Sequence, residues 1–81
     1  AKMQRQEEAK RFAKIIILDI VLYNKKKADE GINNGTFHEI LKEEIEEGLK
    51  LYYARVSSPL LAATNYYDEA IEEYIISNGS R

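Results

Sequence analysis

The sequence has no cysteine and no tryptophan, and it contains only one histidine, one proline and four glycines among its 81 residues. Without cysteine the chain forms no disulfide and offers no thiolate to a metal ion. A chain of this length holds one domain, near the small end of those that fold alone, and such domains often gain stability by oligomerising. We therefore expect one domain over residues 1–81 that is stabilised by association, in a reducing compartment such as the cytoplasm.

The sequence has no apolar run of the length that a membrane span requires. The longest run extends from Ile15 to Tyr23 and includes Asp19, whereas a bilayer needs about 20 apolar residues. The run follows many charged residues and lacks a small-residue cleavage site, so it is not typical of a secretory signal. The ends, Ala-Lys-Met-Gln and Ser-Asn-Gly-Ser-Arg, carry no boundary signal, and we interpret the chain as a fragment of a longer cytoplasmic protein.

Residue types that carry enzyme chemistry are scarce. His38 is followed by Glu39, but a zinc-protease motif needs a second histidine where Lys42 stands. A di-iron site needs Glu-x-x-His pairings on helices, and His38 has no glutamate three residues before it. The glycines lack the spacing of a phosphate-binding loop. We therefore predict a protein that is not an enzyme and has no catalytic residue, cofactor or metal ligand, with His38 as a surface or packing residue.

Charge is distributed unevenly along the chain. Residues 1–27 carry eight basic and three acidic side chains, a net charge of +5, whereas residues 28–81 carry four basic and eleven acidic ones, a net charge of −7. The two parts should attract each other, within one chain or between chains. An alternative is nucleic-acid binding through the basic residues of the first part. Those residues are Lys10, Arg11, Lys14, Lys25, Lys26 and Lys27.

Apolar residues recur at helical spacing along most of the chain, and strand-like alternation is absent. Thr36 and Glu39 have the spacing of a capping box at the start of a helix. Asn34-Gly35 predicts the end of a helix, and Pro59 predicts the start of one. Asn24 is either inside a longer first helix or the cap of a short second one, and Thr64-Asn65 is a possible division of the last helix. We predict helices at about 2–24, 25–33 (short), 37–57 and 59–77.

The apolar run of the first helix covers every direction around the helix, which predicts that residues 15–22 are enclosed on all sides. Asp19 would then be a buried carboxylate, which requires a partner such as Arg11, Lys14, Arg55 or a tyrosine hydroxyl. The sequence leaves open whether Asp19 fixes the packing of helices or contacts a ligand. Gly48, inside a helix, predicts the close approach of a neighbouring backbone or a kink.

The chain also resembles a helical segment found towards the C-terminus of bacterial multi-domain, regulatory-type proteins of unknown function. The residues that carry the resemblance are 9–14 (Ala-Lys-Arg-Phe-Ala-Lys), 19–24 (Asp-Ile-Val-Leu-Tyr-Asn), 30–31, 34–36, 46–48, 51–52 and 55–56. The resemblance implies an appended helical module and assigns no catalytic residue.

Together these patterns predict an all-α bundle of three main helices, with a possible short fourth, that is completed by homodimerisation. The leading hypothesis for its function is a non-enzymatic module that dimerises a larger regulatory protein or docks it to a partner protein. The predicted interface residues are Phe12, Ile16, Ile17, Asp19, Ile20, Tyr23 and Tyr52. The alternatives are the nucleic-acid binding described above and the binding of a small ligand or metal near Asp19 and the acidic helix.

Overall fold

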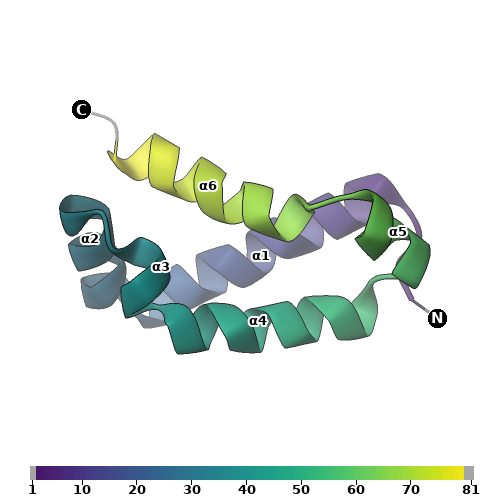
Figure 1. The fold of residues 1–81 in the computed structure, drawn as a ribbon, viewed down its shortest axis with the longest axis horizontal. Helices are drawn as coiled ribbons and strands as arrows, with labels where there is room; N and C mark the ends of the chain where they lie inside the picture. The colour runs from purple at the N-terminus through teal and green to yellow at the C-terminus, as the bar shows by residue number, and fades with distance from the viewer. Residues whose placement is uncertain (1, 80–81) are drawn as a thin grey trace.

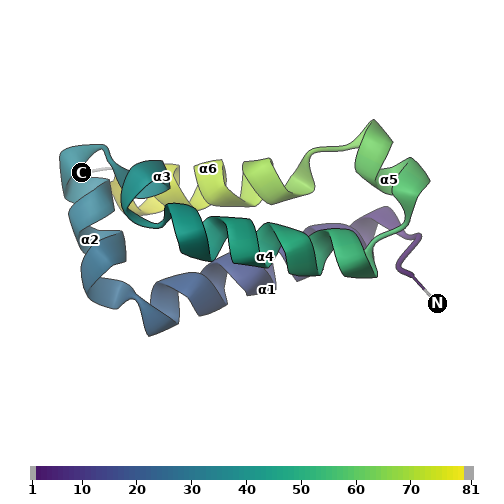
Figure 2. The ribbon, with the colours of Figure 1, turned by 60° about the horizontal axis from the view of Figure 1, so that its bottom comes forward.

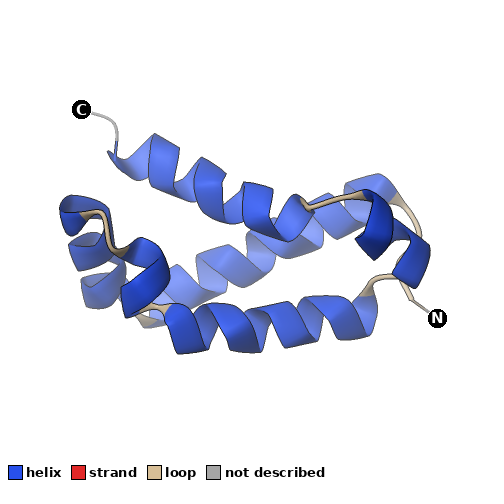
Figure 3. Ribbon diagram, viewed as in Figure 1, coloured by secondary structure: helices blue, strands red, loops and turns tan. Residues whose placement is uncertain are grey.

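The computed structural model describes residues 2–79, and nearly all of this range is helical (Figure 3). Within it lie α1 (Gln6–Tyr23), α2 (Lys25–Asn34), α3 (Phe37–Ile40), α4 (Lys42–Arg55), α5 (Ser58–Ala63) and α6 (Tyr66–Gly79). The prediction of an all-α fold is confirmed. The predicted number of helices is not confirmed. The described residues form three long and three short helices, because the last two predicted helices are each divided into a short and a long one.

Three long helices, α1, α4 and α6, run along the length of the molecule, and the short helices lie at its ends (Figures 1 and 2). Helix α1 packs against both α4 and α6. Helices α2 and α3 pack together at one end, and α5 lies at the other. The molecule measures 38 × 23 × 18 Å. Every long helix therefore presents one side to a shared core and another to solvent.

The core lies between the three long helices and is tightest at Gly48. A Cβ atom at this position would lie 2.7 Å from Cγ2 of Ile16 on α1 and would overlap the hydroxyl of Tyr67 on α6. The Tyr67 hydroxyl donates a 2.7 Å hydrogen bond to the carbonyl of Ile45, one turn before Gly48. The predicted close approach of a neighbouring backbone at Gly48 is not found, because the atoms nearest to this position are side-chain atoms from two helices.

The first helix begins at Gln6 and not at Lys2, because the preceding segment pairs with another part of the backbone. The amide of Met3 donates to the carbonyl of Arg55 (2.7 Å), and the amide of Ser57 donates to the carbonyl of Met3 (2.8 Å). These bonds form an isolated parallel bridge between Met3 and Val56. Residues 2–5 are thus held in an extended conformation beside the junction of α4 and α5.

Asn24 separates α1 from α2, which settles the choice that the sequence left open in favour of a short second helix. Its side-chain amide donates to the carbonyl of Ile20 (2.8 Å) and its backbone amide to that of Val21 (3.2 Å), so the residue closes α1. No side-chain hydrogen bond from Asn24 caps α2. The predicted stop of α2 is confirmed, since Gly35 has the left-handed conformation (φ 69°).

The predicted helix 37–57 is divided at Leu41. This residue leaves the helical conformation (φ −110°, ψ 22°) while its side chain stays fully buried, so the chain turns there without leaving the core. Thr36 does precede α3, but the predicted capping box is not formed. The carbonyl of Thr36 accepts from the amides of Glu39 and Ile40 (3.1 and 2.9 Å), and its side chain makes no capping bond.

The predicted helix 59–77 is divided at Thr64 and Asn65, which was the division that the sequence allowed. The Thr64 hydroxyl donates to the carbonyl of Leu60 (2.7 Å), and its extended backbone (φ −138°, ψ 166°) ends α5. The carbonyl of Asn65 then accepts from the amide of Glu69 (3.0 Å) at the start of α6. Pro59 lies in the first turn of α5, as predicted.

The prediction that residues 15–22 are enclosed on all sides is wrong. Ile16 and Ile17 are buried, but Ile15, Leu18 and Leu22 are exposed. Asp19 is also exposed, and none of its predicted partners forms an ion pair or hydrogen bond with it among residues 2–79. The reason is that α4 and α6 pack against one side of α1 only, so no second layer covers the opposite side.

Candidate protein-binding surface

Helix α1 carries a row of exposed apolar side chains on the side opposite its core contacts. Ile15, Leu18 and Leu22 keep 48, 57 and 68% of their surface exposed. The side of α1 that is buried holds Ala9, Ala13, Ile16 and Ile17. We call Ile15, Leu18 and Leu22 the outer ridge. Large apolar side chains grouped on a surface in this way are typical of a site of contact with another molecule.

The outer ridge has the spacing of a helix-pairing seam. Its residues stand at i, i+3 and i+7, which are the a, d and a positions of a heptad. Lys14 and Asp19 then occupy the g and e positions that flank the seam on its two sides. Both side chains are exposed. The ridge therefore combines an apolar seam with one basic and one acidic border.

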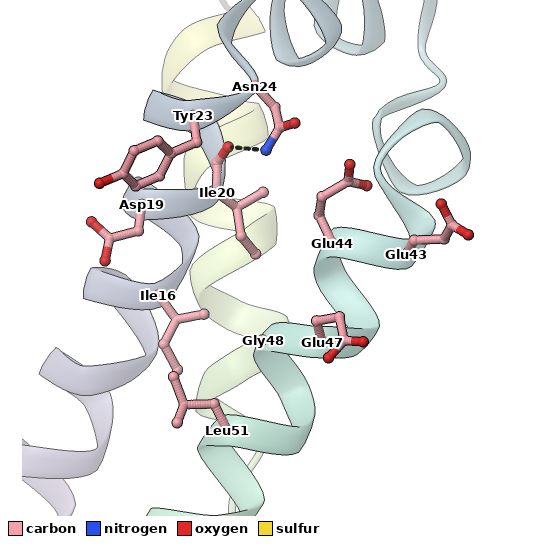
Figure 4. Close-up of a pocket in the computed structure, with 10 residues that line it drawn as sticks. All are labelled: Ile16, Asp19, Ile20, Tyr23, Asn24, Glu43, Glu44, Glu47, Gly48 and Leu51. Carbon is pink, nitrogen blue, oxygen red and sulfur yellow. Dashed lines mark hydrogen bonds between the residues drawn. The ribbon is translucent and has the colours of Figure 1, made fainter.

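A groove of about 520 Å³ lies beside the ridge, between α1 and α4 (Figure 4). Ile16 and Ile20 of α1 and Leu51 of α4 point into it from its two walls, and Gly48 lies at its base, where Ile16 packs against it. Tyr23 and Asn24 lie at the end nearest α2. We call this the α1–α4 groove. Its inner surface is apolar because the side chains that enter it are aliphatic.

The borders of the α1–α4 groove are acidic. Glu43, Glu44 and Glu47 line it on the α4 side and Asp19 on the α1 side, and Asp19 and Glu43 turn outward from it (Figure 4). No basic side chain is among the described residues that line it. Lys27 reaches one of these carboxylates, Glu44, from α2 at 3.5 Å. The groove thus presents a negative border around an apolar interior.

The base of the α1–α4 groove rests on packed tyrosines. Tyr52 stacks on Phe12 (ring centroids 6.1 Å apart) and lies 5.6 Å from the ring of Tyr67. Burial raises the pKa of Tyr67 to about 12, with a smaller contribution from the charge of Asp68. Burial likewise raises the pKa of Tyr52, whose hydroxyl is buried without a hydrogen-bond partner among residues 2–79. Both phenols stay neutral at ordinary pH, and the rings act as packing residues.

The structure scatters the predicted interface residues between the core and the surface. Ile16, Ile17 and Tyr52 are buried by contacts within the chain. Phe12 and Ile20 are partly buried against the same core. The exposed members of the set are Asp19 and Tyr23.

The outer ridge was missed by the sequence reasoning, which chose its neighbours along the helix. A signal for it exists in the alanines. Ala9 and Ala13 are fully buried and mark the side of α1 that other helices approach closely, and the ridge lies on the opposite side. The position of the α4 glutamates beside the groove depends on where α1 lies, and the periodicity of α4 alone does not determine that.

The expected attraction between the basic and the acidic part of the chain is present within the molecule. Lys14 on α1 contacts Glu73 on α6 (3.3 Å), and Lys27 on α2 contacts Glu44 on α4 (3.5 Å). These contacts also occupy two of the residues predicted to bind nucleic acid. Lys10, Arg11, Lys25 and Lys26 are exposed, and Glu7 lies among the residues around Lys10 and Arg11. Nucleic-acid binding stays a prediction.

The structure brings Asp19 and the acidic helix to the same groove, as the ligand hypothesis required, but not into a metal site. Among residues 2–79, no cluster of three or more acidic or histidine side chains is arranged to hold a metal ion. His38 lies at the surface, with its Nε2 atom 3.1 Å from Oε2 of Glu72 on α6. His38 is therefore an exposed residue that joins α3 to α6.

Comparisons with protein-family models, with curated proteins and with solved structures found no match. The resemblance to a bacterial helical segment stays a prediction. Among the described residues, no helix combines the length and the apolar character that a membrane crossing requires.

Proposed function

We propose that this chain is a non-enzymatic helical association module that pairs with a second copy of itself along the outer ridge of α1. The observation that carries the proposal is the exposure of Ile15, Leu18 and Leu22, three large apolar side chains at heptad spacing. Such residues are costly to leave in water, and burying them against the same residues of a copy removes that cost from both chains.

The charges beside the outer ridge support a parallel arrangement of the two α1 helices. In a parallel pair, a g residue faces the e residue of the following heptad in the other helix, so Lys14 of each chain would lie near Asp19 of its partner. In an antiparallel pair that buries the same ridge, Asp19 would lie near Asp19 of the partner, and Lys14 would lie at the far end of the ridge, away from the partner's Asp19. Lys14 also contacts Glu73 of its own chain, but that ion pair is exposed and such pairs hold a side chain weakly.

The length of the seam sets the expected strength of the pairing. From Ile15 to Leu22 an α-helix rises about 10 Å, which is short for a coiled coil. Three side chains from each helix bury less area than a standard specific interface does. We therefore propose a reversible dimer whose population depends on concentration, as suits a module that brings together larger chains.

The test is sedimentation equilibrium from micromolar to millimolar protein, with Leu22→Lys as the variant and Ile76→Lys as its matched control. Both residues are 68% exposed, and each lies in the last turn of its helix. We expect the wild-type chain and Ile76→Lys to dimerise and Leu22→Lys to stay monomeric with an unchanged circular dichroism spectrum. A wild-type chain that is monomeric throughout the range, or equal loss in both variants, would contradict the proposal.

A charge exchange tests the parallel arrangement separately. Lys14→Glu and Asp19→Lys should each weaken the dimer, and the double variant should recover most of the loss, because it restores opposite charges across the seam. An antiparallel dimer would show no such recovery, because Lys14 of one chain and Asp19 of the other do not face each other in that arrangement. Added salt should reduce the difference between the variants.

A further inference from the structure

The α1–α4 groove is a second surface, distinct from the outer ridge, and the self-association proposed above leaves it unused. It is bounded by two long helices and opens to solvent along their length (Figure 4). Its volume of about 520 Å³ is within the range of sites that hold organic ligands and side chains. Ile16, Ile20 and Leu51 supply the interior. An elongated apolar groove between two helices is the shape that receives the apolar face of a third helix.

The charge around the groove restricts what that third helix can be. Four carboxylates, those of Asp19, Glu43, Glu44 and Glu47, line the groove, and Lys27 compensates only Glu44. A phosphate backbone or an anionic membrane surface would be repelled by this border. A helix with lysine or arginine beside its apolar face would be attracted, because its cations would lie next to the carboxylates when its apolar side chains enter the groove.

We propose that the α1–α4 groove binds a basic amphipathic helix of a partner protein. The apolar side chains of that helix lie on Ile16, Ile20 and Leu51, and its lysine or arginine side chains reach Glu43 and Glu47. The proposal does not depend on dimerisation through the outer ridge, which lies on another side of α1.

The base of the groove is held in place before any partner arrives. Gly48 fits between Ile16 and the Tyr67 hydroxyl, and that hydroxyl is bonded to the carbonyl of Ile45. The backbone of α4 at the groove is thus fixed by contacts from both α1 and α6. Binding a helix to such a surface requires little ordering of the receiving protein, which favours affinity.

The probe for the test is a fluorescein-labelled synthetic helix of leucine and lysine in an amphipathic pattern, and the readout is its fluorescence anisotropy. Two comparison peptides replace every lysine by glutamate or every leucine by serine. The protein is the Leu22→Lys variant, so that the outer ridge neither dimerises nor offers an apolar site. We expect binding of the leucine–lysine helix alone, and binding that weakens as salt is raised.

Matched substitutions on α4 locate the binding site. Leu51→Lys places a charge in the apolar interior of the groove. Tyr53→Lys places the same charge at an exposed position of the same helix outside the groove. The two wild-type side chains are similarly exposed, at 44 and 54%. We expect Leu51→Lys to weaken binding at least tenfold and Tyr53→Lys to leave it unchanged. Glu43→Gln with Glu47→Gln should weaken it about fivefold, whereas Glu39→Gln with Glu46→Gln, which removes the same charge outside the groove, should not.

Several results would overturn the proposal. Equal losses in the groove variants and their controls would mean that the helix responds only to net charge. If the probe binds the wild-type chain but not Leu22→Lys, its site is the outer ridge. If the single variant Leu51→Lys no longer dimerises while the single variant Leu22→Lys still does, the groove is occupied by a second copy of the chain. Failure of the probe to bind would contradict the groove proposal and leave the dimerisation proposal standing. A chain that stays monomeric would contradict the dimerisation proposal and leave the groove proposal standing.

Discussion

Helix α1 is flanked by two hollows, and they differ in what lies across them. The hollow on the α6 side, about 350 Å³, has both apolar and polar walls, and the ion pair of Lys14 with Glu73 lies in it. Its other lining residues are Ile17, Leu18, Ala70, Tyr74, Ser77 and Asn78. The α1–α4 groove on the other side is larger, about 520 Å³, and its apolar interior has acidic borders with no cation opposite most of them. The charges of the first hollow are paired within the chain, whereas most carboxylates around the second have no cation beside them among the described residues.

The two sides of α1 also differ in how the neighbouring helix is held. On the α6 side, contact is made by buried small and branched residues, including Ala13, Ala70 and Ile71. On the α4 side, Gly48 meets Ile16 and Tyr52 stacks on Phe12, and the groove lies beside these contacts. The α6 side should therefore carry more of the stability, and the α4 side more of the binding.

Ile71→Ala should have the largest effect on the free energy of unfolding. The side chain is only 1% exposed, and removing it leaves a cavity, which costs about 2–5 kcal/mol in a well-packed core. Urea unfolding followed by circular dichroism measures the loss, with Ile76→Ala as the control at an exposed position of the same helix. A loss below that of most surface substitutions would mean that α6 is loosely packed on α1.

Gly48→Ala should have the next largest effect on the free energy of unfolding, and the sign of that effect decides between two expectations. Helix propensity alone predicts that alanine stabilises a helix interior by about 1 kcal/mol relative to glycine. The added Cβ would instead meet Ile16 and the Tyr67 hydroxyl, and forced overpacking costs about 1–3 kcal/mol. We expect a net loss of stability in the same unfolding experiment, and a gain would show that α4 does not approach its neighbours as closely as described.

Tyr67→Phe should have the smallest effect, because it removes one hydrogen bond, worth about 1 kcal/mol. Tyr52→Phe is its control, since the Tyr52 hydroxyl is buried without a partner among the described residues, and we expect that change to cost nothing or to stabilise. Equal losses in the two variants would show that the Tyr67 bond contributes no specific stability.

Tyr67 also makes the stability of the fold depend on pH in the alkaline range. The pKa of Tyr67 is about 12 in the folded chain, above its ordinary value of 10.0, so the folded state holds the phenolic proton more tightly than the unfolded state does. The stability from this difference is complete below pH 10 and is lost as the pH rises from 10 towards 12. Melting temperatures measured across this range should fall less steeply in Tyr67→Phe than in the wild-type chain.

The sequence predicted the helices well where local chemistry decides them. Gly35 and Pro59 mark boundaries that depend on local chemistry, and they lie where expected, while Asn24 forms one of the two boundaries that the sequence allowed. Leu41 and Met3 behave otherwise for reasons outside their own neighbourhoods. Leu41 interrupts a continuous apolar stripe to stay in the core, and Met3 pairs with residues that are distant in sequence.

The candidate site was predicted less well, because the composition of α1 does not state which of its sides is covered. Residues 15–22 are apolar all round, and enclosure was the natural expectation. Only the positions of α4 and α6 decide that Ile16 and Ile17 are buried while Ile15, Leu18 and Leu22 are exposed. The acidic border of the groove depends in the same way on two helices coming together.

The bridge that Met3 forms with Arg55 and Ser57 has a consequence for the order of folding. It closes a loop of about fifty residues, and the entropy lost in such a closure is recovered only after the helices between its ends have packed. This bridge should therefore form after α1 and α4 have packed together, and it should break before they separate. The segment before Gln6 accordingly belongs to the least stable unit of a chain whose helices otherwise make their contacts early.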